Sequence, residues 1–166
     1  MGKKFGKYIL TMFGVGYITK FPGTIASAIT TMLYLLFYWL KVHYFFLICS
    51  FILILPLSVY LVDYLKNDFR EIDAKEIVVD EYLGQSIPII IFYILLYEGS
   101  FSFSFFSIFT FLSFVGFRFF DILKPFPINY VDKNFKNGYG VVFDDILAGI
   151  YTALILYLCI LIYGKL

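Results

Sequence analysis

The sequence predicts an all-α integral membrane protein, a bundle of about five helices with the N-terminus in the cytoplasm. Of its 166 residues, 61% are apolar and only 15% are charged, whereas a soluble domain is typically nearer half apolar and a quarter charged. Phe (22) and Tyr (15) are so frequent that a soluble core of this size could not cover their rings, although lipid can. No linker or charge run divides the chain, so we expect a single domain over 1–166.

The first element is a short basic and apolar segment. Three lysines in the first seven residues precede an apolar stretch at 8–18, which superficially resembles a signal peptide. Gly14 and Gly16 interrupt this stretch, and a longer apolar run follows it at once. We therefore expect a retained segment that lies at the membrane interface or re-enters the bilayer.

The predicted spans are five charge-free runs, at 21–40, 44–62, 82–97, 99–117 and 146–163. A helix needs about 20 residues to cross a typical hydrocarbon core, and about 17 is the lower limit. The third run is short and contains Gly84, Gln85 and Pro88, so we expect it to be tilted, kinked or sheltered by neighbouring helices. The runs do not alternate polar and apolar residues, which argues against strands.

Charged residues are distributed unevenly between the two sides of the membrane. If all five runs cross, the segments 1–20, 63–81 and 118–145 share one side, and they contain eleven of the 13 basic residues. The positive-inside rule therefore places these segments in the cytoplasm. Eleven of the 12 acidic residues lie on the same side, and only Glu98 lies on the other. A net charge of +1 offers no basic surface for nucleic acid.

Acidic side chains gather where three spans meet the cytoplasmic edge: Asp80 and Glu81 begin the third, Asp121 ends the fourth, and Asp144 and Asp145 open the fifth. Two carboxylates about 4 Å apart repel by about 4 kcal/mol at an effective dielectric of 20, so five together require a cation. Carboxylate oxygens suit a hard ion such as Mg²⁺. The alternative is that paired acids cap helix N-termini, but this does not account for Asp121 at a C-terminus.

Groups suited to phosphate stand beside these acids. Arg118 can donate to two phosphate oxygens at once, and Lys124 supplies a point charge. Thr24 and Ser27 follow a Pro-Gly pair at the entry to the first span, where free backbone N–H groups could bind an anion. The alternative roles are neutralisation of the acids or contact with lipid headgroups for the two cations, and helix capping for Thr24.

Five stretches of the chain also resemble the motifs of a known protein family. They read FGVGY and FPGTIAS at 13–17 and 21–27, IVVDEYLG at 77–84, FRFFDILKPFPI at 117–128 and GYGVVFDDILAG at 138–149. In this order they resemble the motifs of the phosphatidylglycerophosphatase A family. Ala26 stands where that family usually has glycine, and Asn137 where it often has the first of two glycines.

The resemblance implies a Mg²⁺-dependent lipid phosphatase of the bacterial inner (cytoplasmic) membrane. It would remove the terminal phosphate of phosphatidylglycerophosphate and leave phosphatidylglycerol. The phospholipid substrate would stay in the membrane with its headgroup at a cytoplasmic-face active site, and a bundle with short spans is compatible with a homo-oligomer. The rival interpretations are another lipid-phosphate phosphatase, a small cation transporter and a non-catalytic lipid-binding subunit. A transporter would need acids at mid-depth in the bilayer, whereas these spans are free of charge.

The predicted site follows from these residues and the resemblance together. Metal binding and activation of the attacking group are predicted for Asp80, Glu81, Asp121, Asp144 and Asp145. Phosphate binding is predicted for Arg118, Lys124, Thr24 and Ser27. Second-rank candidates are Asp73 and Glu76.

Overall fold

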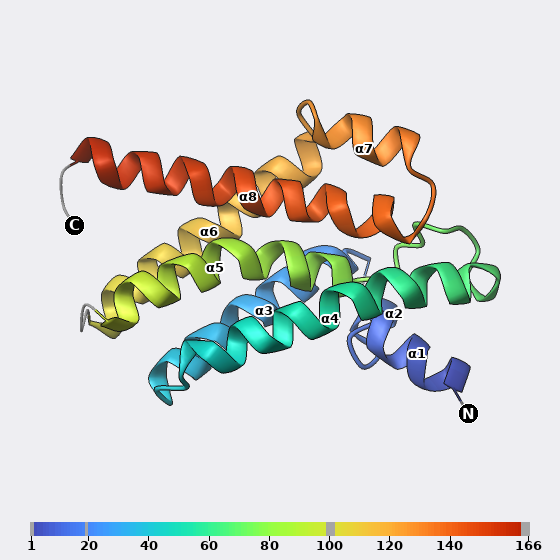
Figure 1. Cartoon of the computed structure of the whole chain (residues 1–166), viewed down its shortest axis with the longest axis horizontal. Coiled ribbons are helices and arrows are strands. Elements are labelled where there is room, and N and C mark those ends of the chain that lie inside the picture. Colours follow the sequence, from blue (N-terminus) through green and yellow to red (C-terminus); the bar gives the residue numbers. More distant parts are fainter. Residues whose placement is uncertain (1, 19, 99–101, 164–166) are drawn as a thin grey trace.

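A computed structural model describes residues 2–18, 20–98 and 102–163 of the chain, and these residues form helices and connecting turns without any strand (Figure 1). The all-α prediction is therefore confirmed. The elements are α1 (Gly2–Leu10), α2 (Val15–Ile18), α3 (Pro22–Trp39), α4 (Tyr44–Leu65), a 3-10 turn (Lys66–Asp68), α5 (Val79–Glu98), α6 (Phe103–Leu123), α7 (Ile128–Asn134) and α8 (Gly138–Tyr163).

Among the residues that the structure describes, four segments are long and apolar enough to cross a membrane: Tyr44–Asp68, Val79–Tyr97, Phe103–Leu123 and Gly138–Ile162. They carry exposed apolar side chains, among them Leu53, Phe111 and Leu158, which suits contact with lipid. The 18-residue α3 is not one of the four. The total of five spans and the side of the N-terminus therefore stay predictions.

Three helices extend beyond the predicted apolar runs at the polar edge. α5 begins at Val79 rather than at 82, α6 continues to Leu123 rather than ending at 117, and α8 begins at Gly138 rather than at 146. A charge-free run shows how much of a helix lipid can cover. The helix itself continues as long as its backbone hydrogen bonds are formed, so it can be longer than the run. Asp144 and Asp145 consequently lie about two turns inside α8. The alternative that these paired acids cap a helix N-terminus therefore does not hold for Asp144 and Asp145.

The short third run is the centre of the bundle. α5 contacts α3, α4, α6 and α8, and 61% of its membrane-length window is buried inside the protein. Sheltering by neighbours, one of the expected outcomes, is thus confirmed. It explains how Gln85 and Ser86, both fully buried, are accommodated in a segment of membrane-spanning length.

Glycines allow α5 and α8 to approach closely. A Cβ atom on Gly84 would lie 2.5 Å from the carbonyl oxygen of Asp145 and 2.6 Å from the ring of Phe117, and one on Gly149 would overlap with the carbonyl oxygen of Gly84. Figure 1 shows α3, α5 and α8 running in one direction and α4 and α6 in the other. The beginnings of α5 and α8 therefore lie at the same end of the bundle.

The N-terminal segment forms two short helices beside the bundle. The amphipathic α1 packs on α4, where Gly6 faces the side chains of Leu61 and Leu65. The backbone N–H of Val78 donates to the carbonyl of Leu10 at 2.9 Å, which ties this segment to the start of α5. Its location at the membrane interface stays a prediction.

Candidate functional site

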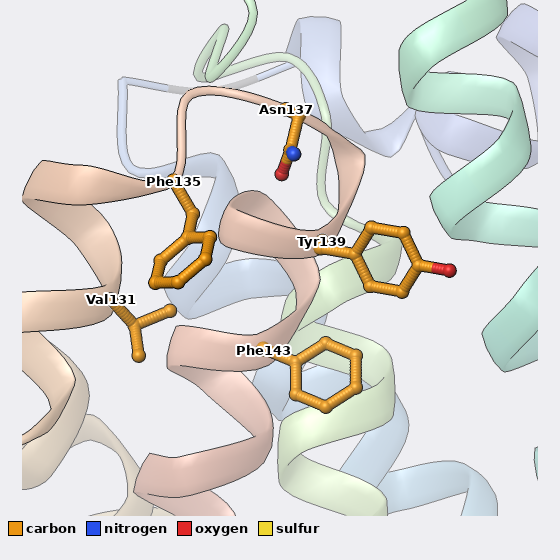
Figure 2. A pocket seen from close by; sticks show the side chains of 5 residues that line it. All are labelled: Val131, Phe135, Asn137, Tyr139 and Phe143. Atoms are coloured by element: carbon orange, nitrogen blue, oxygen red, sulfur yellow. The ribbon is translucent and has the colours of Figure 1, made fainter.

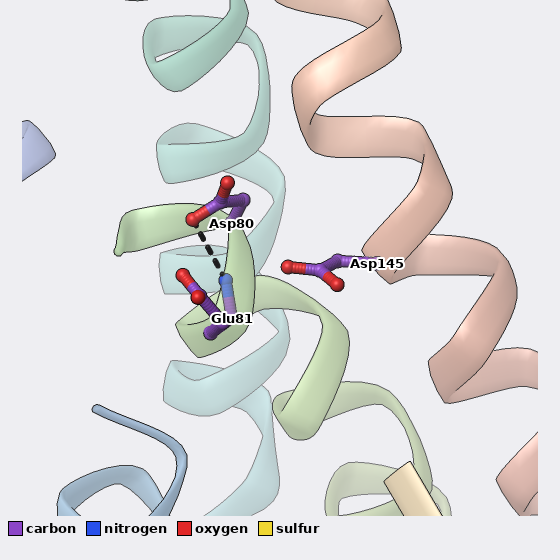
Figure 3. A group of neighbouring side chains, drawn as sticks. All are labelled: Asp80, Glu81 and Asp145. Carbon is purple, nitrogen blue, oxygen red and sulfur yellow. Dashed lines mark hydrogen bonds between the residues drawn. The ribbon is translucent and has the colours of Figure 1, made fainter. Parts of the chain in front are cut away.

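Three carboxylates from two helices meet at the polar end of the bundle. Asp80 and Glu81 come from the first turn of α5 and Asp145 from α8, and each offers an oxygen within 4.8 Å of the others. Figure 3 shows the three side chains converging, with the Oδ1 of Asp80 accepting a hydrogen bond of 3.0 Å from the backbone N–H of Glu81. Asp80 is only 5% exposed and Asp145 only 4%. The cluster is therefore largely withdrawn from water.

The donor set of this cluster fits a hard divalent cation. Carboxylates at such separations repel one another strongly when ionised, by about 4 kcal/mol for a pair at 4 Å and an effective dielectric of 20. The Oε2 of Glu81 is buried and has no hydrogen-bond partner among the described residues. Carboxylate oxygens are the ligands that Mg²⁺ prefers. A Mg²⁺ ion held by Asp80, Glu81 and Asp145 would both offset the repulsion and satisfy the unpaired oxygen.

Arg118 and Asp121 border the cluster on the α6 side. The Nη1 of Arg118 lies 2.6 Å from the Oδ2 of Asp121, although within the described ranges this pair lacks hydrogen-bond geometry and the Nε of Arg118 is also without a partner. The charge of Asp121 acts on both Glu81 and Asp145. Asp121 is thus adjacent to Glu81 and Asp145 and also forms an ion pair with Arg118.

The N-terminus of α3 approaches Glu81 and Arg118. A Cβ atom on Gly23 would overlap with the Oε1 of Glu81 and lie 3.3 Å from the Nη1 of Arg118. The glycine is therefore required for this approach. The free backbone N–H groups at this helix end are placed where an anion bound by Arg118 could use them.

A second network joins α6, α7 and α8 through Lys124. The Nζ of Lys124 lies 2.5 Å from the Oδ2 of Asp144 and 3.0 Å from the Oδ1 of Asp132. Burial by itself would lower the pKa of Lys124, but the charges and hydrogen bonds of the two acids raise this pKa above its ordinary value. Lys124 therefore stays charged and holds Asp144. Its two acidic partners argue against the predicted direct contact with phosphate.

The remaining predicted residues occupy different surroundings. Ser27 is fully buried and donates its hydroxyl to the carbonyl of Gly23 at 2.9 Å, which argues against a direct phosphate contact. Thr24 is half-buried in the first turn of α3. Asp73 is exposed and lines a small pocket with Asp132. A Cβ atom on Gly16 would overlap with the backbone carbonyl of Glu76, so α2 packs tightly against that residue.

An apolar pocket of about 310 Å³ lies between α7 and the start of α8 (Figure 2). Its lining side chains come from α7, the following turn and the start of α8, and they are Val131, Phe135, Asn137, Tyr139 and Phe143. A neighbouring pocket of about 360 Å³ against α4 shares Tyr139 and Phe143. The two pockets offer apolar surface close to the acidic end of the bundle.

Comparison with known proteins decides the family. The family model described as phosphatidylglycerophosphatase A matches residues 8–160, which include every candidate site residue. The chain belongs to the phosphatidylglycerophosphatase A family. The resemblance of its motifs to that family is thus confirmed, and membership makes the protein a phosphatase rather than a cation transporter or a non-catalytic subunit.

Relatives in bacteria support this assignment. A phosphatidylglycerophosphatase A of Haemophilus influenzae is 37% identical over 145 residues, which cover 87% of this chain and 82% of the relative. The protein of that name in Escherichia coli is 31% identical, covering 87% of this chain and 77% of its own. A putative phosphatidylinositol-3-phosphatase of Bacteroides thetaiotaomicron is 29% identical, covering 88% and 87%. No solved structure matches the chain.

For this member of the phosphatidylglycerophosphatase A family, sequence reasoning missed two residues of the site region. From the sequence alone Asp132 has no predicted role, yet its Oδ1 accepts a hydrogen bond of 3.0 Å from the Nζ of Lys124. The signal was the Pro-containing turn at 125–127, because a turn after Lys124 can place the following residues within reach of its side chain. Gln85 lies four residues after Glu81, and this helical spacing was the signal that could have linked it to the cluster.

Proposed function

We propose that this phosphatase removes the terminal phosphate of phosphatidylglycerophosphate in a Mg²⁺-dependent reaction. Two relatives carry the name of that activity. The observation that carries the proposal is the meeting of three carboxylates, those of Asp80 and Asp145 buried, beside an arginine whose Nε lacks a partner in the described part of the chain. Cation ligands and a phosphate-binding group are thus adjacent at one end of a bundle of apolar helices.

Each residue has a distinct role in the proposal. Asp80, Glu81 and Asp145 hold the ion, which when bound supplies positive charge to a phosphoryl oxygen and to the attacking group. Arg118 binds the phosphate and offsets the negative charge that develops on it. Asp121 orients Arg118 through their ion pair.

Further groups support this arrangement. The α3 N-terminus adds backbone N–H donors for the same phosphate, with Thr24 as a further contact. Lys124 fixes Asp144 next to the metal ligands. Mg²⁺ is favoured over a softer ion because each of the three proposed ligands is a carboxylate.

The geometry suits a substrate that stays in the bilayer. The cluster lies where the apolar helices end, so a phosphomonoester headgroup can reach it while the acyl chains remain in lipid. The apolar pockets beside Tyr139 and Phe143 suit the part of the lipid next to the headgroup. With the basic segments on the same side, the positive-inside rule favours a cytoplasmic-face site in the inner membrane.

A second substrate class has a specific observation in its favour. The Bacteroides relative named as a putative phosphatidylinositol-3-phosphatase matches this chain over nearly the same length as the other two. A phosphomonoester on another lipid headgroup would meet the same carboxylates and arginine. The headgroup beyond the phosphate therefore decides between the two substrates.

The test measures phosphate release by the purified full-length protein in detergent. The substrates are phosphatidylglycerophosphate, phosphatidylinositol 3-phosphate and phosphatidic acid, each with Mg²⁺ and with EDTA. We expect release from phosphatidylglycerophosphate with Mg²⁺ and almost none with EDTA. Preference for the inositol lipid would replace the proposed substrate, and equal release in EDTA would refute the dependence on Mg²⁺.

A further inference from the structure

Gln85 is a buried polar side chain that the proposed roles do not use. It lies on α5 with 0% exposure, and neither its Oε1 nor its Nε2 has a hydrogen-bond partner in the described residues. An amide withdrawn from water without partners is unfavourable, whereas an apolar side chain of similar size would be accommodated without penalty. Such a residue indicates a ligand-bound state in which the amide is paired.

The position of Gln85 relative to Glu81 identifies one partner. The two residues are four apart and share one face of α5, with Cβ atoms about 5–6 Å apart. Helical side chains lean toward the N-terminus of their helix, so Gln85 extends toward the turn that carries Glu81. The Oε2 of Glu81 is itself buried and unpartnered within the ranges described. An unpaired donor and an unpaired acceptor therefore lie one turn apart.

Packing prevents α5 from rotating to expose this amide. Gly84, the residue before Gln85, lies against the backbone of Asp145 on α8 and against the ring of Phe117 on α6. Both contacts would tighten if the helix turned about its axis. Gln85 is consequently held one turn below the carboxylates.

We propose that Gln85 is a positioning residue of the metal centre. Its amide N–H donates to Glu81 and fixes the orientation of that carboxylate, and its carbonyl oxygen accepts from a water ligand of the ion. Mg²⁺ usually keeps several water ligands, and residues that orient metal ligands typically alter metal affinity by 10–100-fold. The inference rests on the proposed function only in requiring that the cluster bind a divalent cation.

The test is calorimetric titration of Mg²⁺ into the purified full-length protein in detergent. Gln85→Met keeps the length of the side chain without its hydrogen bonds, and Gln85→Asn keeps the amide but shortens its reach. We expect each variant to weaken Mg²⁺ binding by about 10–100-fold. Without metal, the Tm of Gln85→Met should equal or exceed that of wild type, because the unpaired amide is gone. Thr110→Val is the control, since Thr110 is buried and donates to the carbonyl of Phe106 on α6.

The outcomes separate this inference from the proposed function. Wild-type affinity in both Gln85 variants would overturn the positioning role and leave the metal-dependent function intact. Absence of Mg²⁺ binding by the wild-type protein would instead refute the metal centre itself. Should Gln85→Met fail to fold, Gln85→Asn decides, and weakened binding in Thr110→Val as well would assign the effect to general packing.

Discussion

Gly84 and Gly149 meet backbone to backbone where α5 crosses α8, since a Cβ atom on Gly149 would overlap with the carbonyl oxygen of Gly84. That carbonyl lacks its usual helical donor because the residue four positions later is Pro88, which has no N–H. The close crossing brings the first turn of α5 against α8, and with it Glu81 toward Asp145. A contact between two glycines thereby sets the spacing of the carboxylates.

Replacing Gly149 with alanine should therefore damage both stability and activity. The added Cβ meets backbone that cannot move aside, so α8 must shift away from α5. We expect the free energy of unfolding to fall by about 1–3 kcal/mol, as for other overpacked sites, and phosphate release to fall with it. Thermal unfolding and lipid-phosphate hydrolysis in detergent measure the two effects.

The matched control for that change is Gly6→Ala in α1, where the added Cβ meets only the side-chain ends of Leu61 and Leu65. These ends can adjust, so near-normal stability is expected. A Gly149→Ala protein as stable and active as wild type would show that the glycine crossing is unimportant for the site.

Neutralising one metal ligand should abolish turnover without preventing folding. Asp80→Asn and Asp145→Asn each keep the size of the side chain and remove its charge. We expect phosphate release from phosphatidylglycerophosphate to fall by at least about 100-fold in each, above the effect typical of residues that only orient ligands. Asp68→Asn is the control, because Asp68 pairs with Lys3 at 3.0 Å on the N-terminal side. Full activity in both test variants would remove these residues from the site.

Metal binding should also raise the thermal stability of the protein. A cation that binds only the folded protein stabilises it by about 2.7 kcal/mol at a concentration 100 times its Kd. The Tm of the wild-type protein should therefore rise when EDTA is replaced by excess Mg²⁺. Asp145→Asn should lose most of this increase, whereas Asp68→Asn should keep it. Identical Tm values of the wild type in Mg²⁺ and EDTA would argue against the centre without any activity assay.

Lys124 should behave as a structural cation rather than as a phosphate ligand. Lys124→Met leaves Asp144 and Asp132 without their partner, and we expect a loss of about 1–3 kcal/mol in the free energy of unfolding. Asp132→Asn should lose less, because Asp132 is 26% exposed in its side chain against 8% for Asp144. A phosphate-binding role would give the opposite pattern, a raised KM with unchanged stability. Thermal unfolding combined with steady-state kinetics distinguishes the two.

Much of the helical fold was predictable from the chain alone. Apolar runs and the positions of charges are local properties, so four membrane-length helices and the polar edge followed from them directly. α5, α6 and α8 each continue past the predicted span, because the loss of apolar character does not end a helix. Sheltering of α5 by its neighbours was one of three outcomes expected from its short apolar run with Gly84, Gln85 and Pro88.

The sequence by itself determined that this is a helical membrane phosphatase with its charged motif residues at one end, because hydrophobicity, charge and motif order are properties of the chain. Only the tertiary structure decided which of the five acidic side chains lie together and which form ion pairs with cations. One cluster contains Asp80, Glu81 and Asp145. Asp121 forms an ion pair with Arg118, and Asp144 forms an ion pair with Lys124. The physical reason is that side-chain separation depends on where helices cross and how they rotate about their axes. Those quantities follow from packing, here from the contact of Gly84 with Gly149, and not from spacing along the chain.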